Sequence, residues 1–125
     1  MTMQGIDCAS YQAGIDPSVV PCDFVIVKST QGTTYTNPDF RRLAGATLAA
    51  GKALGIYHYA SGGNATAEAN YMLDVAGAYI GRAIFCLDWE GEQNGAFDSG
   101  RDSAWIDEFC SVIESRVGAD CLVYL

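Results

Sequence analysis

The chain has 125 residues, half of them hydrophobic, and a net charge of −8 with a sequence pI near 4.3. This length and composition suffice for one domain with a hydrophobic core. The acidic balance argues against nucleic acids and anionic membrane surfaces as partners. No apolar run approaches the roughly 18 residues of a membrane span, and the N-terminus lacks the features of a secretory signal. We therefore expect synthesis in the cytoplasm, with any export by another route.

The predicted elements alternate between strand and helix along the chain. β-branched and aromatic runs bounded by turn residues indicate the strands, and apolar residues at helical spacing indicate the helices. A single helical turn is expected at 17–20. The strands are expected at residues 5–10, 24–30, 52–60 and 84–89 and from 121 onward, and the long helices at 38–50, 66–79 and 100–117.

Capping signals set the expected ends of the helices. Asn37 and Pro38 suit the N-cap and the first helical position, and Gly51 is placed to end that helix. Ser99 and Asp102 can form a capping box after a polar, glycine-containing loop at 91–100. The third helix then has one apolar stripe, made of Trp105, Ile106, Phe109, Val112 and Ile113.

Five cysteines show no C-x-x-C spacing, which argues against a zinc site. Most fall in strand-like or apolar helical segments, so we expect reduced structural thiols rather than disulfides or a nucleophile. No metal site and no cofactor are predicted. The cysteines are Cys8, Cys22, Cys86, Cys110 and Cys121.

Strands separated by helices predict an α/β fold with a parallel sheet. Functional sites in such folds lie at the carboxyl ends of the strands. Polar and aromatic residues from five predicted strands converge on that edge. They are Asp7, Lys28, Tyr57, Tyr59, Asp88, Glu90 and Tyr124.

Asp88 and Glu90 are the most informative pair, because they end an apolar strand and are separated by one residue. Residues two apart on a strand share a face and lie roughly 6.6 Å apart. Each carboxylate raises the cost of ionising the other, and such pairs serve as acid and base in glycosidases. A solvated strand end is the alternative, and the pair by itself favours neither. The spacing also leaves open whether the reaction would retain or invert the anomeric configuration.

The other candidates are assigned by strand alternation and by loop position. Tyr57 and Tyr59 share a face, where they could contact sugar or pack as buried aromatics of the barrel. His58 must point to the opposite face, into the core. Lys28 lies within a hydrophobic strand and needs a partner, for which Asp7 or Asp88 is expected. Three loop residues are weaker candidates for sugar contacts: Tyr11, Gln12 and Tyr35.

Five segments in this order are similar to one family. The chain resembles the family 25 glycoside hydrolases, lysozymes that include many phage endolysins and bacterial autolysins. The resemblance spans nearly all of the chain. The segments are Gly5-Ile-Asp-Cys-Ala-Ser-Tyr-Gln12, Phe24-Val-Ile-Val-Lys-Ser-Thr-Gln-Gly32, Asn37-Pro-Asp-Phe40, Gly55-Ile-Tyr-His-Tyr59 and Leu87-Asp-Trp-Glu90.

The resemblance implies a flattened, irregular TIM-like (β/α) barrel of eight strands, of which the first five are present. Residues 1–125 would then be the N-terminal part of a single catalytic domain. The implied activity is an N-acetylmuramidase that cleaves the β-1,4 bond between N-acetylmuramic acid and N-acetylglucosamine in peptidoglycan, with net retention. It would act on the cell wall after release by a holin, by lysis or by another route.

Motif matching implies a role for each acid. Glu90 resembles the proton donor, Asp88 its partner and Asp7 a third acid of the cleft. Tyr124 matches a tyrosine that contacts the reacting sugar. The nucleophile stays open, because it could be a carboxylate or the 2-acetamido group of the substrate, oriented by Asp88.

Two other functions fit the residues. A metal-dependent hydrolase could hold a divalent ion between Asp7, Asp88 and Glu90. A non-catalytic glycan-binding module, or pseudoenzyme, would bind the wall without cleaving it. An open sheet edge would in addition permit self-association.

Overall fold

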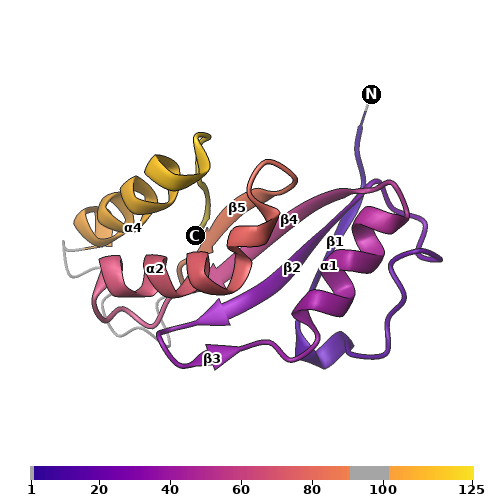
Figure 1. Ribbon diagram of the computed structural model, residues 1–125, viewed down its shortest axis with the longest axis horizontal. Coiled ribbons are helices and arrows are strands. Elements are labelled where there is room, and N and C mark those ends of the chain that lie inside the picture. Colours follow the sequence, from indigo (N-terminus) through magenta and orange to yellow (C-terminus); the bar gives the residue numbers. More distant parts are fainter. Residues whose placement is uncertain (1, 91–101) are drawn as a thin grey trace.

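The computed structural model describes residues 2–90 and 102–125, and its centre is one six-stranded sheet. Five strands are parallel in the order β1-β2-β4-β5-β6, and the short β3 pairs with β2 in the antiparallel direction (Figure 1). The strands are β1 (Gly5–Cys8), β2 (Phe24–Gln31), β3 (Tyr35–Thr36), β4 (Ala53–Tyr59), β5 (Ile84–Asp88) and β6 (Leu122–Tyr124).

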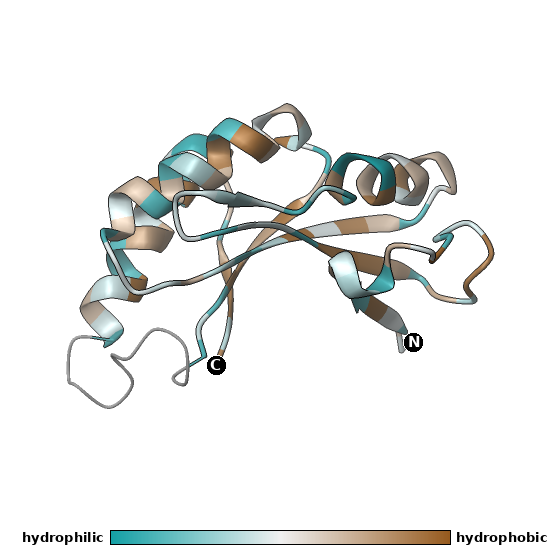
Figure 2. Ribbon diagram, turned by 90° about the horizontal axis from the view of Figure 1, so that it is seen from below, coloured by the Kyte–Doolittle hydropathy of each residue, from teal (hydrophilic) through white to brown (hydrophobic). Residues whose placement is uncertain are grey.

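The helices α1 (Phe40–Ala49), α2 (Ala65–Ala76) and α4 (Asp102–Val117) all lie on one face of this sheet (Figure 2). The 3-10 helices η1 (Ser10–Gln12) and η2 (Gly77–Tyr79) complete the elements. The sheet is not closed into a barrel within the described residues, and β6 is its last strand at one edge. The face of the sheet that carries none of these three helices is open and can form a site.

Side-chain alternation along the strands separates these two faces. Val25 and Val27 of β2 are fully buried on the helix face, whereas Ile26 and Lys28 point to the other face. The pairing of β2 with β4 shifts between Lys28 and Thr30, which marks a β-bulge. The extra residue returns Gln31 to the face of Lys28, as bulges near functional sites often do.

The five parallel strands and three long helices confirm the predicted order, with ends within two to three residues for most elements. Asn37 does not occupy the N-cap position. Its side-chain Oδ1 accepts the Asp39 amide at 3.1 Å, and α1 begins at Phe40. The expected turn at 17–20 is present as a turn, whereas β3 and η1 were not predicted. The predicted loop at 91–100 and the capping role of Ser99 lie outside the described residues.

The α4 stripe packs as expected only at its centre. Phe109 and Ile113 are fully buried, whereas Trp105, Ile106 and Val112 are partly exposed. The Trp105 ring lies 4.7 Å from the Trp89 ring and 5.5 Å from the Phe109 ring, centroid to centroid. This aromatic contact joins α4 to the residue between the two paired acids.

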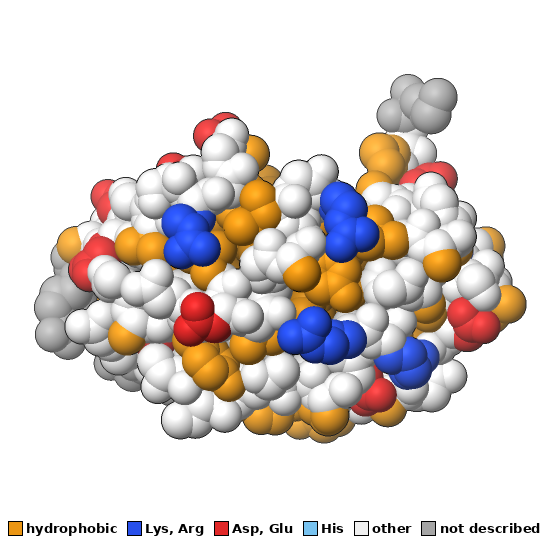
Figure 3. All heavy atoms as spheres, viewed as in Figure 1, with side chains coloured by type: hydrophobic (Ala, Val, Ile, Leu, Met, Phe, Trp, Pro, Cys, Tyr) orange, Lys and Arg blue, Asp and Glu red, His pale blue; other side chains and the backbone are white. Residues whose placement is uncertain are grey.

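All five cysteines are free thiols, and Cys8 and Cys86 are buried. Cys110 and Cys121 are only half-buried, with their thiols hydrogen-bonded to each other. No helix in the described part of the chain is long and apolar enough to cross a membrane. On the face drawn in Figure 3, the Lys and Arg side chains are separated by uncharged surface.

Two glycines, one inside α1 and one just after its end, provide a test of where this helix ends. Gly51 follows the helix at φ 72°, a conformation that costs other residues about 1 kcal/mol. Gly45 is exposed inside α1, and a Cβ there would meet no atom within 4 Å. We expect Gly51→Ala to lower the free energy of unfolding by about 1 kcal/mol and Gly45→Ala to raise it by about 0.8 kcal/mol. Urea unfolding measures both changes in the free energy of unfolding. Two changes of the same sign would contradict the end of α1 before Gly51.

Candidate active site

A cleft of about 420 Å³ lies on the helix-free face of the sheet. Its walls come from the β1, β2, β4, β5 and β6 strands and from the chain just after β5. Five of the predicted site residues line it, namely Asp7, Tyr57, Asp88, Glu90 and Tyr124. The other lining residues are Ile26, Cys86, Leu87, Leu122 and Val123. The cleft therefore combines three carboxyl groups and two tyrosines with an apolar floor.

The register of the sheet explains how these side chains meet. Tyr59, Asp88 and Tyr124 lie side by side on β4, β5 and β6. Tyr57 lies one pleat back on the same face of β4. Asp7 lies one pleat further back, in a row with Ile26 and Gly55.

Tyr57 connects Asp7 to the acidic pair. Burial raises the pKa of the Tyr57 hydroxyl, and the negative charges of Asp7 and Asp88 raise it further. The phenol is therefore neutral near neutral pH and can donate a hydrogen bond. A neutral donor among carboxylates suits a site that binds hydroxyl or acetamido oxygens.

Asp88 and Glu90 form the centre of the cleft. Burial, the charge of Glu90 and a hydrogen bond with the Glu90 carboxyl together raise the pKa of Asp88 to about 6. Because β5 ends at Asp88, Glu90 leaves strand geometry and its carboxyl approaches closer than the spacing of the strand predicts. A hydrogen bond between two carboxyl groups requires a proton on one of them. The pair can therefore hold one proton and one charge.

Within the described part of the chain, one oxygen of the pair is an unpaired hydrogen-bond acceptor. Asp88 Oδ1 is buried and has no hydrogen-bond partner among the described residues. A buried acceptor without a partner is costly unless a substrate group supplies a donor. Trp89 packs into the core on the opposite face and donates its backbone N–H to Tyr124 O at 3.0 Å. This bond holds β6 and the acidic pair in one arrangement.

Among the described residues, Lys28 does not pair with Asp7, Asp88 or another carboxylate as predicted. Its Nζ donates to Gln31 Oε1 at 2.6 Å and lies 5.0 Å above the Tyr59 ring and 5.3 Å above the Tyr35 ring. Burial lowers the pKa of Lys28, while the charges of Asp88 and Glu90 oppose that change. The ammonium group therefore acts on the acids through space, from the side of the cleft.

Lys28, Tyr59 and Gln12 are predicted contacts that do not line the cleft. Tyr59 is 9% exposed beneath Lys28. The Gln12 side chain accepts the Ala9 amide at 2.9 Å, and this bond holds η1. In the described part of the chain, no three His, Cys, Asp or Glu side chains are arranged to hold a metal ion.

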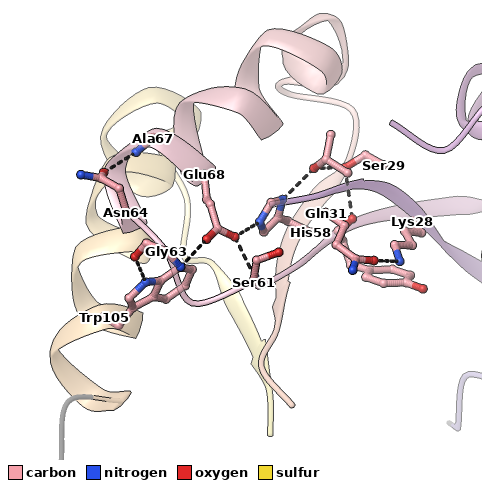
Figure 4. Close-up of polar contacts among 12 residues, drawn as sticks. Lys28, Ser29, Gln31, His58, Ser61, Gly63, Asn64, Ala67, Glu68 and Trp105 are labelled. Carbon is pink, nitrogen blue, oxygen red and sulfur yellow. Dashed lines mark hydrogen bonds and ion pairs between the residues drawn. The ribbon is translucent and has the colours of Figure 1, made fainter. Parts of the chain in front are cut away.

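The sequence analysis missed a buried polar network behind the site (Figure 4). His58 is fully buried, as predicted, and its Nε2 lies 2.9 Å from Glu68 Oε1. Its Nδ1 lies 2.8 Å from the Thr30 hydroxyl. Glu68 stands in the first turn of α2, where an exposed acid is ordinary, so no local signal marked it as buried.

Comparison with known proteins agrees with this geometry. The model of the family "Glycosyl hydrolases family 25" matches residues 6–125. The chain belongs to this family. It is 34% identical to an N,O-diacetylmuramidase of Chalaropsis sp, over 98% of this chain and 65% of that protein. It is 29% identical to lysozyme M1 of Streptomyces globisporus, over 98% of this chain and 46% of that protein.

Solved structures of family 25 proteins have the same fold. A muramidase from Trichobolus zukalii matches with a TM-score of 0.87 and 25% identity, over 99% of this chain and 65% of that one. A bacterial lysozyme from Streptomyces coelicolor matches with a TM-score of 0.87 and 27% identity, over 99% of this chain and 63% of that one. The chain thus has the α/β architecture of the family 25 lysozymes, whose TIM-like barrel is distorted. It spans 65% of the length of the first of these relatives.

Proposed function

We propose that the chain is the N-terminal part of a single catalytic domain that hydrolyses peptidoglycan as an N-acetylmuramidase. The observation that carries this proposal is the hydrogen-bonded Asp88–Glu90 carboxyl pair in a cleft on the open face of the sheet. Its membership of family 25 supports the same conclusion. The bond cleaved would be the β-1,4 bond between N-acetylmuramic acid and N-acetylglucosamine.

The proposed mechanism assigns separate tasks to the two acids. Glu90 is exposed at the mouth of the cleft and donates a proton to the leaving-group oxygen, which is a poor leaving group without it. The pair shares one proton, and when that proton is on Glu90, Asp88 faces the anomeric centre as a carboxylate. Its unpartnered Oδ1 accepts the N–H of the 2-acetamido group and orients that group for attack.

Asp7 and the tyrosines complete the site. Asp7 adds negative charge that stabilises an oxocarbenium-like transition state. Tyr57 donates a hydrogen bond from its hydroxyl to the substrate. Tyr124 lies beside Asp88 at the β6 edge, where it contacts the reacting sugar. Attack by the substrate's own acetamido oxygen, followed by water, would give net retention.

The proposed place of action is the bacterial cell wall, with peptidoglycan glycan strands as the partner. The β6 edge also supports contact with another polypeptide segment. Leu122, Tyr124 and Leu125 are 54%, 65% and 72% exposed, and an open parallel edge favours pairing. Either further strands of the same domain or a second copy of the chain could cover it. Sedimentation of the chain distinguishes the two, because only self-association makes the mass depend on concentration.

Analysis of the products tests the proposed activity. Purified peptidoglycan incubated with the protein is expected to release fragments whose new reducing ends are N-acetylmuramic acid. The rate is expected to be the same with and without a chelator, because protein carboxyls supply the acid. Reducing ends on N-acetylglucosamine would contradict the bond assignment. A rate that falls with chelator and recovers with a divalent ion would favour the metal-dependent mechanism. Binding without release of reducing ends would make the chain a glycan-binding module.

A further inference from the structure

A second hollow, of about 470 Å³, opens beyond the cleft. One wall is the turn from β2 to β3, residues 31–35, and the other is the β4–α2 loop with the start of α2, residues 61–68. We call it the distal hollow. The walls come close together at Gly32 and Ser61. Gly32 has φ 58°, and a Cβ on it would lie 2.7 Å from Ser61 Oγ, so a glycine is required there.

The loop wall of the distal hollow is held by hydrogen bonds that involve Glu68 and Trp105 (Figure 4). Glu68, 1% exposed, accepts the backbone amides of Ser61 at 2.9 Å and Gly63 at 3.0 Å in addition to His58. Trp105 Nε1 donates to Gly63 O at 2.8 Å. Because the loop is fixed before any ligand arrives, binding costs little ordering entropy.

The strand wall is positioned by the β2 bulge. Gln31 Oε1 accepts a hydrogen bond from the Lys28 ammonium group at 2.6 Å. The NH₂ group of the Gln31 side chain takes no part in this bond. Tyr35, 37% exposed, is placed beside the same ammonium group. Together with Thr33, Thr34 and Ser61, these groups form a lining of neutral donors and acceptors with one aromatic ring.

The distal hollow lies on the same row of the sheet as the acidic pair. Gln31, Tyr59 and Asp88 are register neighbours on β2, β4 and β5. Two strand spacings therefore separate Gln31 from Asp88, about 10 Å. A linear polymer lying across the strand ends in the cleft passes directly over Tyr59 to this hollow.

We propose that the distal hollow binds a sugar of the glycan strand adjoining the disaccharide held in the cleft. The inference deepens the proposed function and rests on it for the identity of the polymer. Neutral hydroxyl and amide groups beside an aromatic ring match the hydroxyl and acetamido groups of a hexosamine. Glu68 already accepts three hydrogen bonds, from His58 and from the Ser61 and Gly63 amides, so it fixes the loop.

Two substitutions test the distal hollow without touching the acids. Tyr35→Ala removes the ring, and Ala67→Leu fills the space from an exposed position near the start of α2. Ala104→Leu, at an exposed position near the start of α4, is the matched control. All proteins carry Glu90→Gln to prevent cleavage, and calorimetry measures binding of peptide-free glycan strands and of the N-acetylglucosamine–N-acetylmuramic acid disaccharide.

We expect Tyr35→Ala and Ala67→Leu each to weaken binding of the strands about tenfold while leaving the disaccharide affinity unchanged. Ala104→Leu should change neither affinity. Equal affinities in all proteins would overturn the proposal. A loss seen only with strands that keep their stem peptides would overturn it too, because the hollow would then bind peptide. The readout is binding, so failure of the cleavage proposal would appear separately, as reducing ends that no Glu90 variant affects.

Discussion

Asp88→Asn and Glu90→Gln are each expected to lower the rate of reducing-end release from peptidoglycan about a thousandfold. The Glu90 variant loses the proton that the leaving oxygen needs. The Asp88 variant loses the carboxylate that orients the acetamido group and faces the developing positive charge. Asp74→Asn, at an exposed position of α2, is the control and should retain full activity. Activity of either cleft variant within tenfold of the unmodified protein would contradict the assigned roles.

The Asp88 substitution should also stabilise the fold, in a pH-dependent manner. The folded-state pKa of Asp88 is raised from 3.8 to about 6, so its favourable contribution exists below pH 3.8 and is lost as the pH rises through 6. Asparagine carries no charge at any pH. We therefore expect the free energy of unfolding of Asp88→Asn to be about 1 kcal/mol higher than that of the unmodified protein above pH 6. This value allows for solvent screening of the half-buried carboxyl group. Urea unfolding at pH 4 and pH 7.5 measures the difference, which should be small at the lower pH.

This combination of lost activity and gained stability separates a functional acid from a structural one. A carboxylate retained for an ion pair would lose stability on neutralisation. Neutralising a carboxylate that is held against another acid for catalysis would increase the stability of the fold. A decrease in stability of Asp88→Asn at pH 7.5 would therefore argue against a shared proton in the pair.

The sequence predicted the site through its strand ends, because parallel topology places them together whatever the loops do. Asp7, Tyr57, Asp88 and Tyr124 follow from alternation within a strand, which is a local rule. The hydrogen-bond partner of Lys28 could not be predicted from strand alternation. The β-bulge between Lys28 and Thr30 brings Gln31 onto the Lys28 face, and one extra residue in a strand leaves no periodic signal.

The raised pKa shows a second limit of local reasoning. An acid in a strand end is expected to be perturbed by its neighbours, but burial decides how strongly. Asp88 lies on the strand, partly covered by β4 and β6, whereas Glu90 lies beyond it and is exposed. The pair spacing could be read from the sequence, but the difference in burial depends on the neighbouring strands.

Removing the buried Glu68 carboxylate should cause the largest loss of stability among the substitutions proposed. Glu68→Ala leaves His58 and two backbone amides without an acceptor, and we expect a loss of about 4 kcal/mol. Glu68→Gln keeps the shape but only one acceptor oxygen, so a loss of about 2 kcal/mol is expected. Glu108→Gln, an exposed control on α4, should change stability by less than about 0.5 kcal/mol.

The same network predicts that the fold weakens in acid. Burial lowers the pKa of His58 below 6.5, and its donors hold the pKa of Glu68 below 4.5. Both contributions exist above those ordinary values and are lost as the pH falls through the lowered ones. His58 is the only histidine, so NMR titration of one imidazole gives its pKa directly. A His58 pKa above 6.5 would contradict the burial of a neutral imidazole in the folded state. The Asp88 contribution changes in the opposite direction between pH 3.8 and about 6, so comparing pH 7 with pH 5 in the Asp88→Asn variant isolates the loss of stability caused by His58 and Glu68.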